Sequence, residues 1–116
     1  MNLPIGTHVT VDGEHANPDL LNNVEALTAH MENALALAGA TWLGTLNHEF
    51  TPQGVTILMM LAESHISLHT YPEHCVYFAD VFTCGTECDP KVAAYHLVQS
   101  LGGTAHVTTT KRGNLP

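Results

Sequence analysis

The chain has 116 residues, 45% of them hydrophobic and only 12% charged, which fits a single folded domain spanning residues 1–116. Its formal net charge is −8 with three basic residues, which argues against nucleic acid and against an anionic membrane surface as partners. Three cysteines, with no signal peptide and no long apolar run, favour a reducing cytosol, so we predict a cytoplasmic protein. The low charge also suggests that some surface is hidden in an oligomer.

The first half of the chain is typical of a strand, a helix and two further strands. Asn17 and Pro18 form a helix start, and apolar residues at three- and four-residue spacing continue the helix to Gly39. A nearly continuous apolar run before Glu63 indicates a buried strand. The strands expected in this half cover residues 7–11, 41–48 and 55–62.

The second half is typical of two strands joined by a turn at residues 71–74, followed by a helix and a last strand. Asp89 and Pro90 form another helix start, and this helix is expected to end near Leu101, before two glycines. The expected order is therefore β-α-β-β-β-β-α-β. We predict an α+β fold, a two-layer sandwich of a mainly antiparallel sheet with two helices on one face. The strands expected in this half cover residues 65–70, 76–82 and 105–109.

The stretch from Glu63 to Glu73 contains two carboxylates, two serines and two histidines within eleven residues. Ser64 directly follows the buried strand, so its hydroxyl could attack its own peptide bond in an N→O acyl shift. Base-catalysed elimination would then leave a pyruvoyl group and divide the chain. The ordinary alternative is a serine at a strand edge.

His65, Ser67 and His69 share one face of the following strand by two-residue alternation, whereas Ser64 points to the other. A kink after Ser64, or a contact from a turn, is therefore required if Ser64 and His69 are to meet. A near-neutral imidazole is a suitable base for the acyl shift and elimination. The spacing of His65 and His69 suits a metal site only on a helix, so no metal site is predicted. The histidines for which we favour a structural role are His8, His15, His30, His74, His96 and His106.

Cys84 follows an apolar strand and precedes Gly85, where a ligand can approach the backbone. A thiol there could deliver a proton to a carbanion. For Cys75 and Cys88 we favour the simpler interpretation of small buried residues.

Several blocks of the chain together resemble the small prokaryotic S-adenosylmethionine decarboxylase family. The most specific are the Glu-Ser-His block at residues 63–65, the His-Thr-Tyr-Pro-Glu block at 69–73 and Phe-Thr-Cys-Gly at 82–85. The resemblance covers nearly the whole chain, from Gly6 to Gly113.

The resemblance implies cleavage between Glu63 and Ser64 into fragments 1–63 and 64–116. Ser64 would become a covalently bound pyruvoyl cofactor that forms a Schiff base with substrate. His69 would be the proton acceptor in processing, and Cys84 the proton donor in decarboxylation and an aid to processing. The residues it places around the substrate are Phe50, Thr56 and Glu73.

By this resemblance, the reaction converts S-adenosylmethionine to CO2 and the aminopropyl donor for spermidine synthesis. It also implies a homodimer of cleaved protomers with active sites at the subunit interface. The family usually has lysine or arginine where Thr7 stands and commonly tryptophan where Tyr71 stands, and both positions bear on substrate recognition. Two alternatives stay open: the same chemistry acting on arginine or ornithine, and a non-catalytic relative that binds a small molecule or metal.

Overall fold

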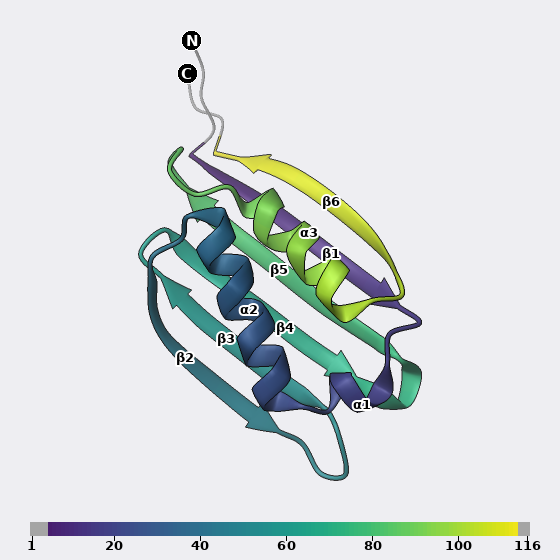
Figure 1. Ribbon diagram of the computed structural model, residues 1–116. Coiled ribbons are helices and arrows are strands. Elements are labelled where there is room, and N and C mark those ends of the chain that lie inside the picture. Colours follow the sequence, from purple (N-terminus) through teal and green to yellow (C-terminus); the bar gives the residue numbers. More distant parts are fainter. Residues whose placement is uncertain (1–4, 114–116) are drawn as a thin grey trace.

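The computed structural model describes residues 5–113, which form one six-stranded sheet with helices packed on one of its faces (Figure 1). The strand order is β2-β3-β4-β5-β1-β6, and every neighbouring pair is antiparallel. The predicted α+β two-layer architecture is therefore confirmed. The strands are β1 (Gly6–Glu14), β2 (Trp42–Glu49), β3 (Val55–Leu61), β4 (Ser64–Tyr71), β5 (Val76–Cys84) and β6 (Thr104–Arg112).

The single helix predicted from Pro18 to Ala38 is instead two helices. The first ends at Leu21, and the side chain of Asn23 then accepts a hydrogen bond from the N–H of Ala26 at 3.0 Å. Asparagine side chains compete for backbone N–H groups in this way, so they favour a helix start over a helix interior. The helices are α1 (Pro18–Leu21), α2 (Val24–Ala38) and α3 (Pro90–Leu101), and a short 3-10 turn covers Pro72–His74.

The end of α2 lies against the start of α3. Gly39 terminates α2 with a φ of 77°, a left-handed conformation that glycine adopts without steric cost. The N–H of Asp89, which caps α3, donates to the carbonyl of Ala38 at 3.0 Å. The two long helices therefore lie side by side in opposite directions across the sheet (Figure 1). No helix among the described residues has the length and apolar character needed to cross a membrane.

The core fills the space between these helices and the sheet. Alternate residues of each central strand point toward the helices and are almost fully buried, and each large side chain buried in this way contributes about 1.5–3 kcal/mol. Completely buried members of this core include Ile57, Ile66, Leu68, Leu27, Met31 and Leu97.

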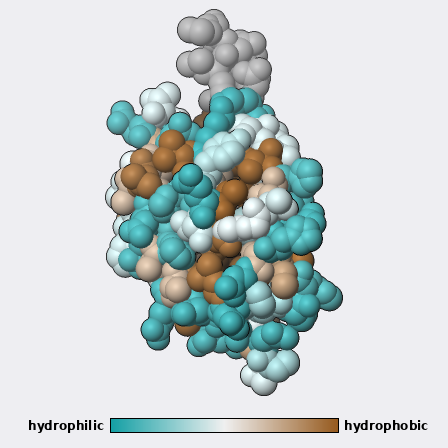
Figure 2. Space-filling model, turned by 45° about the vertical axis from the view of Figure 1, so that its right-hand side comes forward, coloured by the Kyte–Doolittle hydropathy of each residue, from teal (hydrophilic) through white to brown (hydrophobic). Residues whose placement is uncertain are grey.

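Among residues 5–113, no helix or strand covers the opposite face of the sheet. The continuous apolar run predicted to be a buried strand is β3, and helices cover only one of its faces. On the other face Leu58 is 45% exposed and Met60 is 65% exposed, and the neighbouring strand β2 exposes Leu46 to 74%. We call this surface the open face. Figure 2 is turned 45° from Figure 1 and still looks from the helix side, where the surface is mainly hydrophilic with apolar patches.

Candidate functional site

Ser64 is the first residue of β4, immediately after the tight connection from β3. The carbonyl oxygen of the preceding residue, Glu63, accepts two hydrogen bonds from Cys84 at the end of β5. The N–H of Cys84 donates at 3.1 Å and its thiol Sγ donates at 3.2 Å. The structure thus brings together the predicted cleavage residues and the predicted proton donor. Two donors on one carbonyl oxygen polarise the peptide bond between Glu63 and Ser64 toward nucleophilic attack.

Of the three cysteines, only Cys84 is exposed. Burial raises the pKa of the Cys88 thiol, and the negative charges of Glu63 and Asp89 raise it further. The interpretation of Cys88 as a small buried residue is confirmed, whereas Cys75 is half-buried. Cys84 is therefore the thiol that a substrate can approach.

The second group of predicted residues lies at the other end of β4. Thr56 pairs with His69 across β3 and β4, and the Thr56 hydroxyl lies 3.3 Å from His69 Nδ1. Phe50 and Glu73 line the same cavity of about 330 Å³ as these two residues. The Phe50 ring packs edge-on against His48, with ring centroids 4.6 Å apart. The three residues predicted to bind substrate thus surround the predicted processing histidine.

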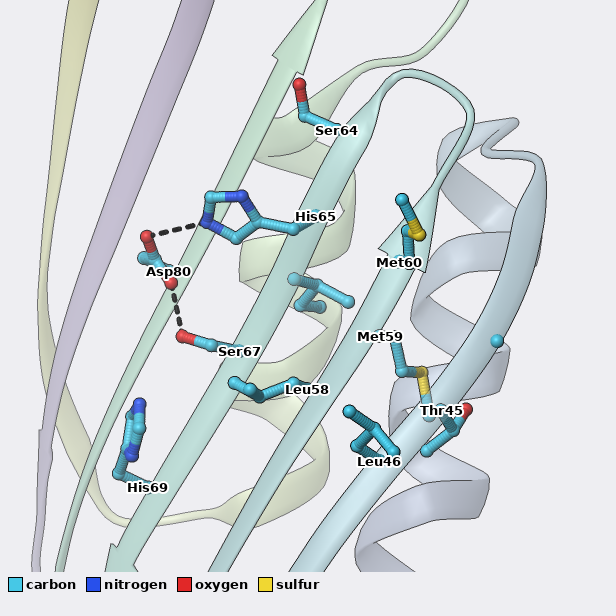
Figure 3. A pocket seen from close by; sticks show the side chains of 12 residues that line it. Thr45, Leu46, Leu58, Met59, Met60, Ser64, His65, Ser67, His69 and Asp80 are labelled. Carbon is cyan, nitrogen blue, oxygen red and sulfur yellow. Dashed lines mark hydrogen bonds and ion pairs between the residues drawn. The ribbon is translucent and has the colours of Figure 1, made fainter.

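These two groups do not meet within one protomer. β4 is continuous from Ser64 to Tyr71 and pairs with β5 along its whole length, without the kink that a contact between Ser64 and His69 requires. Their Cα atoms are five residue steps of extended chain apart, which is about 16 Å. Figure 3 shows the two side chains at opposite ends of the strand. His65, Ser67 and His69 all face the open side, as alternation predicts, and Ile66 and Leu68 face the core.

Between the two ends, Asp80 of β5 is the centre of a polar cluster that sequence reasoning missed. Its carboxylate accepts hydrogen bonds from His8 Nε2 at 2.7 Å, from His65 Nε2 at 3.2 Å and from the Ser67 hydroxyl (Figure 3 shows the last two). A carboxylate only accepts, so both histidines must carry their proton on Nε2. We call these four residues the Asp80 cluster.

The pKa of Asp80 reflects two opposed effects. Partial burial raises the pKa of the carboxyl, but the hydrogen bonds from Ser67, His8 and His65 together outweigh burial and hold it below its ordinary value. Asp80 is therefore a carboxylate at neutral pH. The structural role favoured for His8 agrees with this cluster. His65, which belongs to the stretch from Glu63 to Glu73, is also a member of the cluster.

A shallow cavity of about 740 Å³ runs along the open face and connects the two ends of β4. Its walls are mainly apolar, and Ser64, His69 and Asp80 supply polar groups along it. Among residues 5–113 no three His, Cys, Asp or Glu side chains are arranged to hold a metal ion. The reactive groups that line or border this cavity are hydroxyl, imidazole, thiol and carboxylate groups.

A family model for S-adenosylmethionine decarboxylase matches residues 7–113, nearly the whole chain. The chain belongs to the S-adenosylmethionine decarboxylase family. Its members are carboxy-lyases, so this family membership makes the chain an enzyme of that class.

Individual relatives of this decarboxylase family match over most of their length. The chain is 45% identical over 96 residues to the S-adenosylmethionine decarboxylase proenzyme of Brevibacillus brevis, covering 83% of this chain and 72% of that protein. It is 39% identical over 112 residues to the proenzyme of Prochlorococcus marinus, covering 97% and 92%. The crystal structure of the adenosylmethionine decarboxylase from Aquifex aeolicus VF5 superposes with a TM-score of 0.91 at 30% identity, covering 98% of this chain and 95% of that one.

Proposed function

We propose that this decarboxylase is made as a proenzyme that cuts itself between Glu63 and Ser64 and converts Ser64 into a pyruvoyl group. The mature enzyme then releases CO2 from S-adenosylmethionine. The observation that carries the proposal is the pair of hydrogen bonds from Cys84 to the Glu63 carbonyl, at the bond where family resemblance places the cut. The curated relatives bear the name proenzyme, which supports self-processing here.

The chemistry of processing follows from these groups. The Ser64 hydroxyl attacks the Glu63 carbonyl carbon, and the negative charge that develops on the oxygen is stabilised by the two donors of Cys84. The carbon–nitrogen bond breaks, the amine nitrogen takes up a proton, and an ester replaces the amide. A base removes the Ser64 α-proton, which expels the Glu63 carboxylate and leaves dehydroalanine. Water then replaces the nitrogen, which leaves as ammonia, and a ketone remains on the new chain end.

The residues around Ser64 fit a pyruvoyl group. The carbonyl that accepts from Cys84 belongs to the residue just before the new terminus, so the thiol lies next to the position where the group forms. A pyruvoyl group supplies an electron sink for decarboxylation, as pyridoxal phosphate does in other enzymes. The Cys84 thiol is then placed to give a proton to the α-carbon of the product. Phe50 stacks on the adenine, and Thr56 and Glu73 bind polar groups of the substrate.

We further propose that the active enzyme is a homodimer with shared sites. Ser64 and His69 lie about 16 Å apart on one strand, too far for His69 to take a proton from the same chain's Ser64. A two-fold axis near the middle of β4 would place Ser64 of one protomer over His69 of the partner subunit. The group around Ser64 and Cys84 of one protomer and the group around His69 of the partner subunit would then form one complete site.

The open face supplies the surface for such a dimer. Leu46, Leu58 and Met60 are exposed side by side on β2 and β3, and exposed apolar patches of this kind mark interaction sites. A second copy of the same chain would bury this face on both protomers. The dimer would then have four layers, with the two sheets in the middle and the helices of each protomer on the outside. The three free cysteines suit a cytoplasmic setting for this enzyme.

The proposal is tested first by denaturing mass spectrometry of the purified protein. Two fragments corresponding to residues 1–63 and 64–116 are expected, and the second should lack a free N-terminal amine. A chain that stays intact under all conditions contradicts the proposal. Release of CO2 is then compared for S-adenosylmethionine, arginine and ornithine, and preference for either amino acid overturns the substrate assignment.

A further inference from the structure

Thr41 lies in the connection between α2 and β2. It forms hydrogen bonds with Ala62 and Glu63, the two residues just before the proposed cleavage bond. Its N–H donates to the Glu63 carboxylate at 2.9 Å, and its carbonyl accepts the N–H of Ala62 at 2.9 Å. We call this pair of hydrogen bonds the Thr41 clamp. It ties the connection between β3 and β4 to a part of the chain 22 residues away.

The clamp has a fixed anchor because Thr41 follows the capped end of α2. Gly39 closes the helix in the left-handed conformation, and the N–H of Ala40 donates back to the carbonyl of Leu35 at 3.0 Å. Such a cap satisfies the last carbonyls of a helix and fixes the direction of the departing chain. The N–H of Thr41 is therefore held at a defined position.

Glu63 is thus held from two sides. Its side chain is bound at the start of β2 by Thr41, and its carbonyl oxygen is bound at the end of β5 by Cys84. The hydrogen bond from the Thr41 N–H holds the pKa of the Glu63 carboxyl below its ordinary value, so the group is a carboxylate at neutral pH. Together the contacts fix how the peptide plane between Glu63 and Ser64 is turned.

We propose that the Glu63 side chain is a positioning group for self-cleavage, acting through the Thr41 clamp to turn its own carbonyl oxygen toward Cys84. This inference rests on the proposed function. The carboxylate takes no part in the bonds that form and break. It limits rotation of the peptide plane, so the oxygen lies where its two donors can stabilise the developing charge.

Loss of the hydrogen bond between Thr41 and Glu63, one of the two bonds of the clamp, should slow cleavage without abolishing it. Glu63→Ala removes the acceptor, and misplacement of a reacting carbonyl costs roughly 10- to 100-fold in rate. Glu63→Gln keeps an amide oxygen that can accept from Thr41, so it should recover most of that loss. Thr41→Pro deletes the N–H donor, leaves the Thr41 carbonyl in place and does not alter the residue at the cut.

The experiment follows cleavage of freshly translated chains over time by denaturing electrophoresis, with mass spectrometry to confirm the cut. Thermal melting of each variant checks that it is folded. Glu49→Ala is the matched control, since it removes a carboxylate at the opposite end of β2 from Thr41. We expect Glu63→Ala and Thr41→Pro to slow cleavage to a similar extent. The double variant should be no slower than either single variant, because both remove one interaction.

Two results overturn the inference. One is cleavage of Glu63→Ala within twofold of wild type. The other is equal slowing of Glu63→Ala and Glu63→Gln at unchanged melting temperature, since the loss is then unrelated to the hydrogen bond. Both leave the proposed function intact, provided the wild-type chain cuts itself. Failure of the wild-type chain to cut removes the proposed function instead.

Discussion

Cys84 contacts the carbonyl oxygen of Glu63 with two donors, its N–H at 3.1 Å and its thiol at 3.2 Å. The first is a backbone group whose position is set by the pairing of Ser64 with Thr83 across β4 and β5. The second belongs to the side chain alone. The two contributions to self-cleavage can therefore be separated by substitution, because the N–H remains in any variant except proline.

Replacing the thiol should slow self-cleavage but not stop it. Cys84→Ala keeps the backbone donor and loses the weaker thiol donor, so we expect a slowing of roughly 10- to 100-fold, below the full effect of an oxyanion-hole donor. Chains that do mature should release CO2 more slowly still, since the proposed proton donor is gone. The measurements are a cleavage time course and CO2 release per mole of mature chain.

Cys75→Ala is the matched control for this substitution. Cys75 is half-buried in the turn before β5, and its loss should leave cleavage unchanged. Wild-type cleavage rates in Cys84→Ala would contradict the role assigned to the thiol.

Ser64→Ala should remain a single chain with no decarboxylase activity. Without a hydroxyl no ester can form, and no ketone can be made at this position. Intact-mass measurement under denaturing conditions reads the result directly. Ser67→Ala, which removes a hydroxyl three residues along the same strand, should still be cleaved. A cut between residues 63 and 64 in Ser64→Ala would show that the nucleophile has been misassigned.

The sequence predicted the parts of this molecule that depend on local pattern. Strand and helix periodicity, the capping signals at Asn17 and Asp89, and the open-side placement of His65 and His69 are all confirmed. The helix around Asn23 was predicted wrongly because an apolar stripe continues through it. Periodicity does not reveal where a side chain competes with the helix backbone.

The sequence could not reveal contacts that depend on strand order. Asp80 and His8 are 72 residues apart, and they meet only because β1 lies beside β5 in the sheet. No motif links the two residues. Alternation placed Ser64 and His69 on opposite sides of the strand, but only the unbroken β4 shows that the two residues do not meet within one chain.

The Asp80 cluster should stabilise the fold in a pH-dependent way. Asp80→Asn weakens hydrogen bonds to three partners, and we expect a loss of about 1–2 kcal/mol in the free energy of unfolding at pH 7. The pKa of the folded-state carboxyl lies below the ordinary 3.8, so its contribution is fully present above about pH 5. It is lost as the pH falls through the lowered folded-state pKa.

Urea unfolding of wild type and Asp80→Asn at one protein concentration measures this difference across pH. The gap between the two proteins should be widest near neutrality and should close in acid. A gap that persists unchanged at pH 2 would show that the carboxylate charge is not what stabilises the cluster.

If each active site is shared between two protomers, mixing two variants that are inactive alone should restore cleavage of one of them. Ser64→Ala lacks the nucleophile but keeps His69, and His69→Ala keeps Ser64 but lacks the imidazole. Each variant alone should remain largely uncleaved. In a mixed dimer, Ser64 of the His69→Ala chain faces the intact His69 of the partner subunit, so that chain should be cut. Co-expression with distinguishable tags, followed by denaturing mass spectrometry, identifies which chain is cleaved.

The identity of the cleaved chain decides between the two arrangements. Cleavage confined to the His69→Ala chain is expected only if the imidazole acts across the dimer, because that chain has none of its own at this position. Absence of cleavage in verified mixed dimers would place nucleophile and base in one chain, which requires β4 to bend away from its pairing with β5. Leu58→Asp puts a charge on the open face and should weaken dimers and slow cleavage together if, as proposed, each site draws on both protomers.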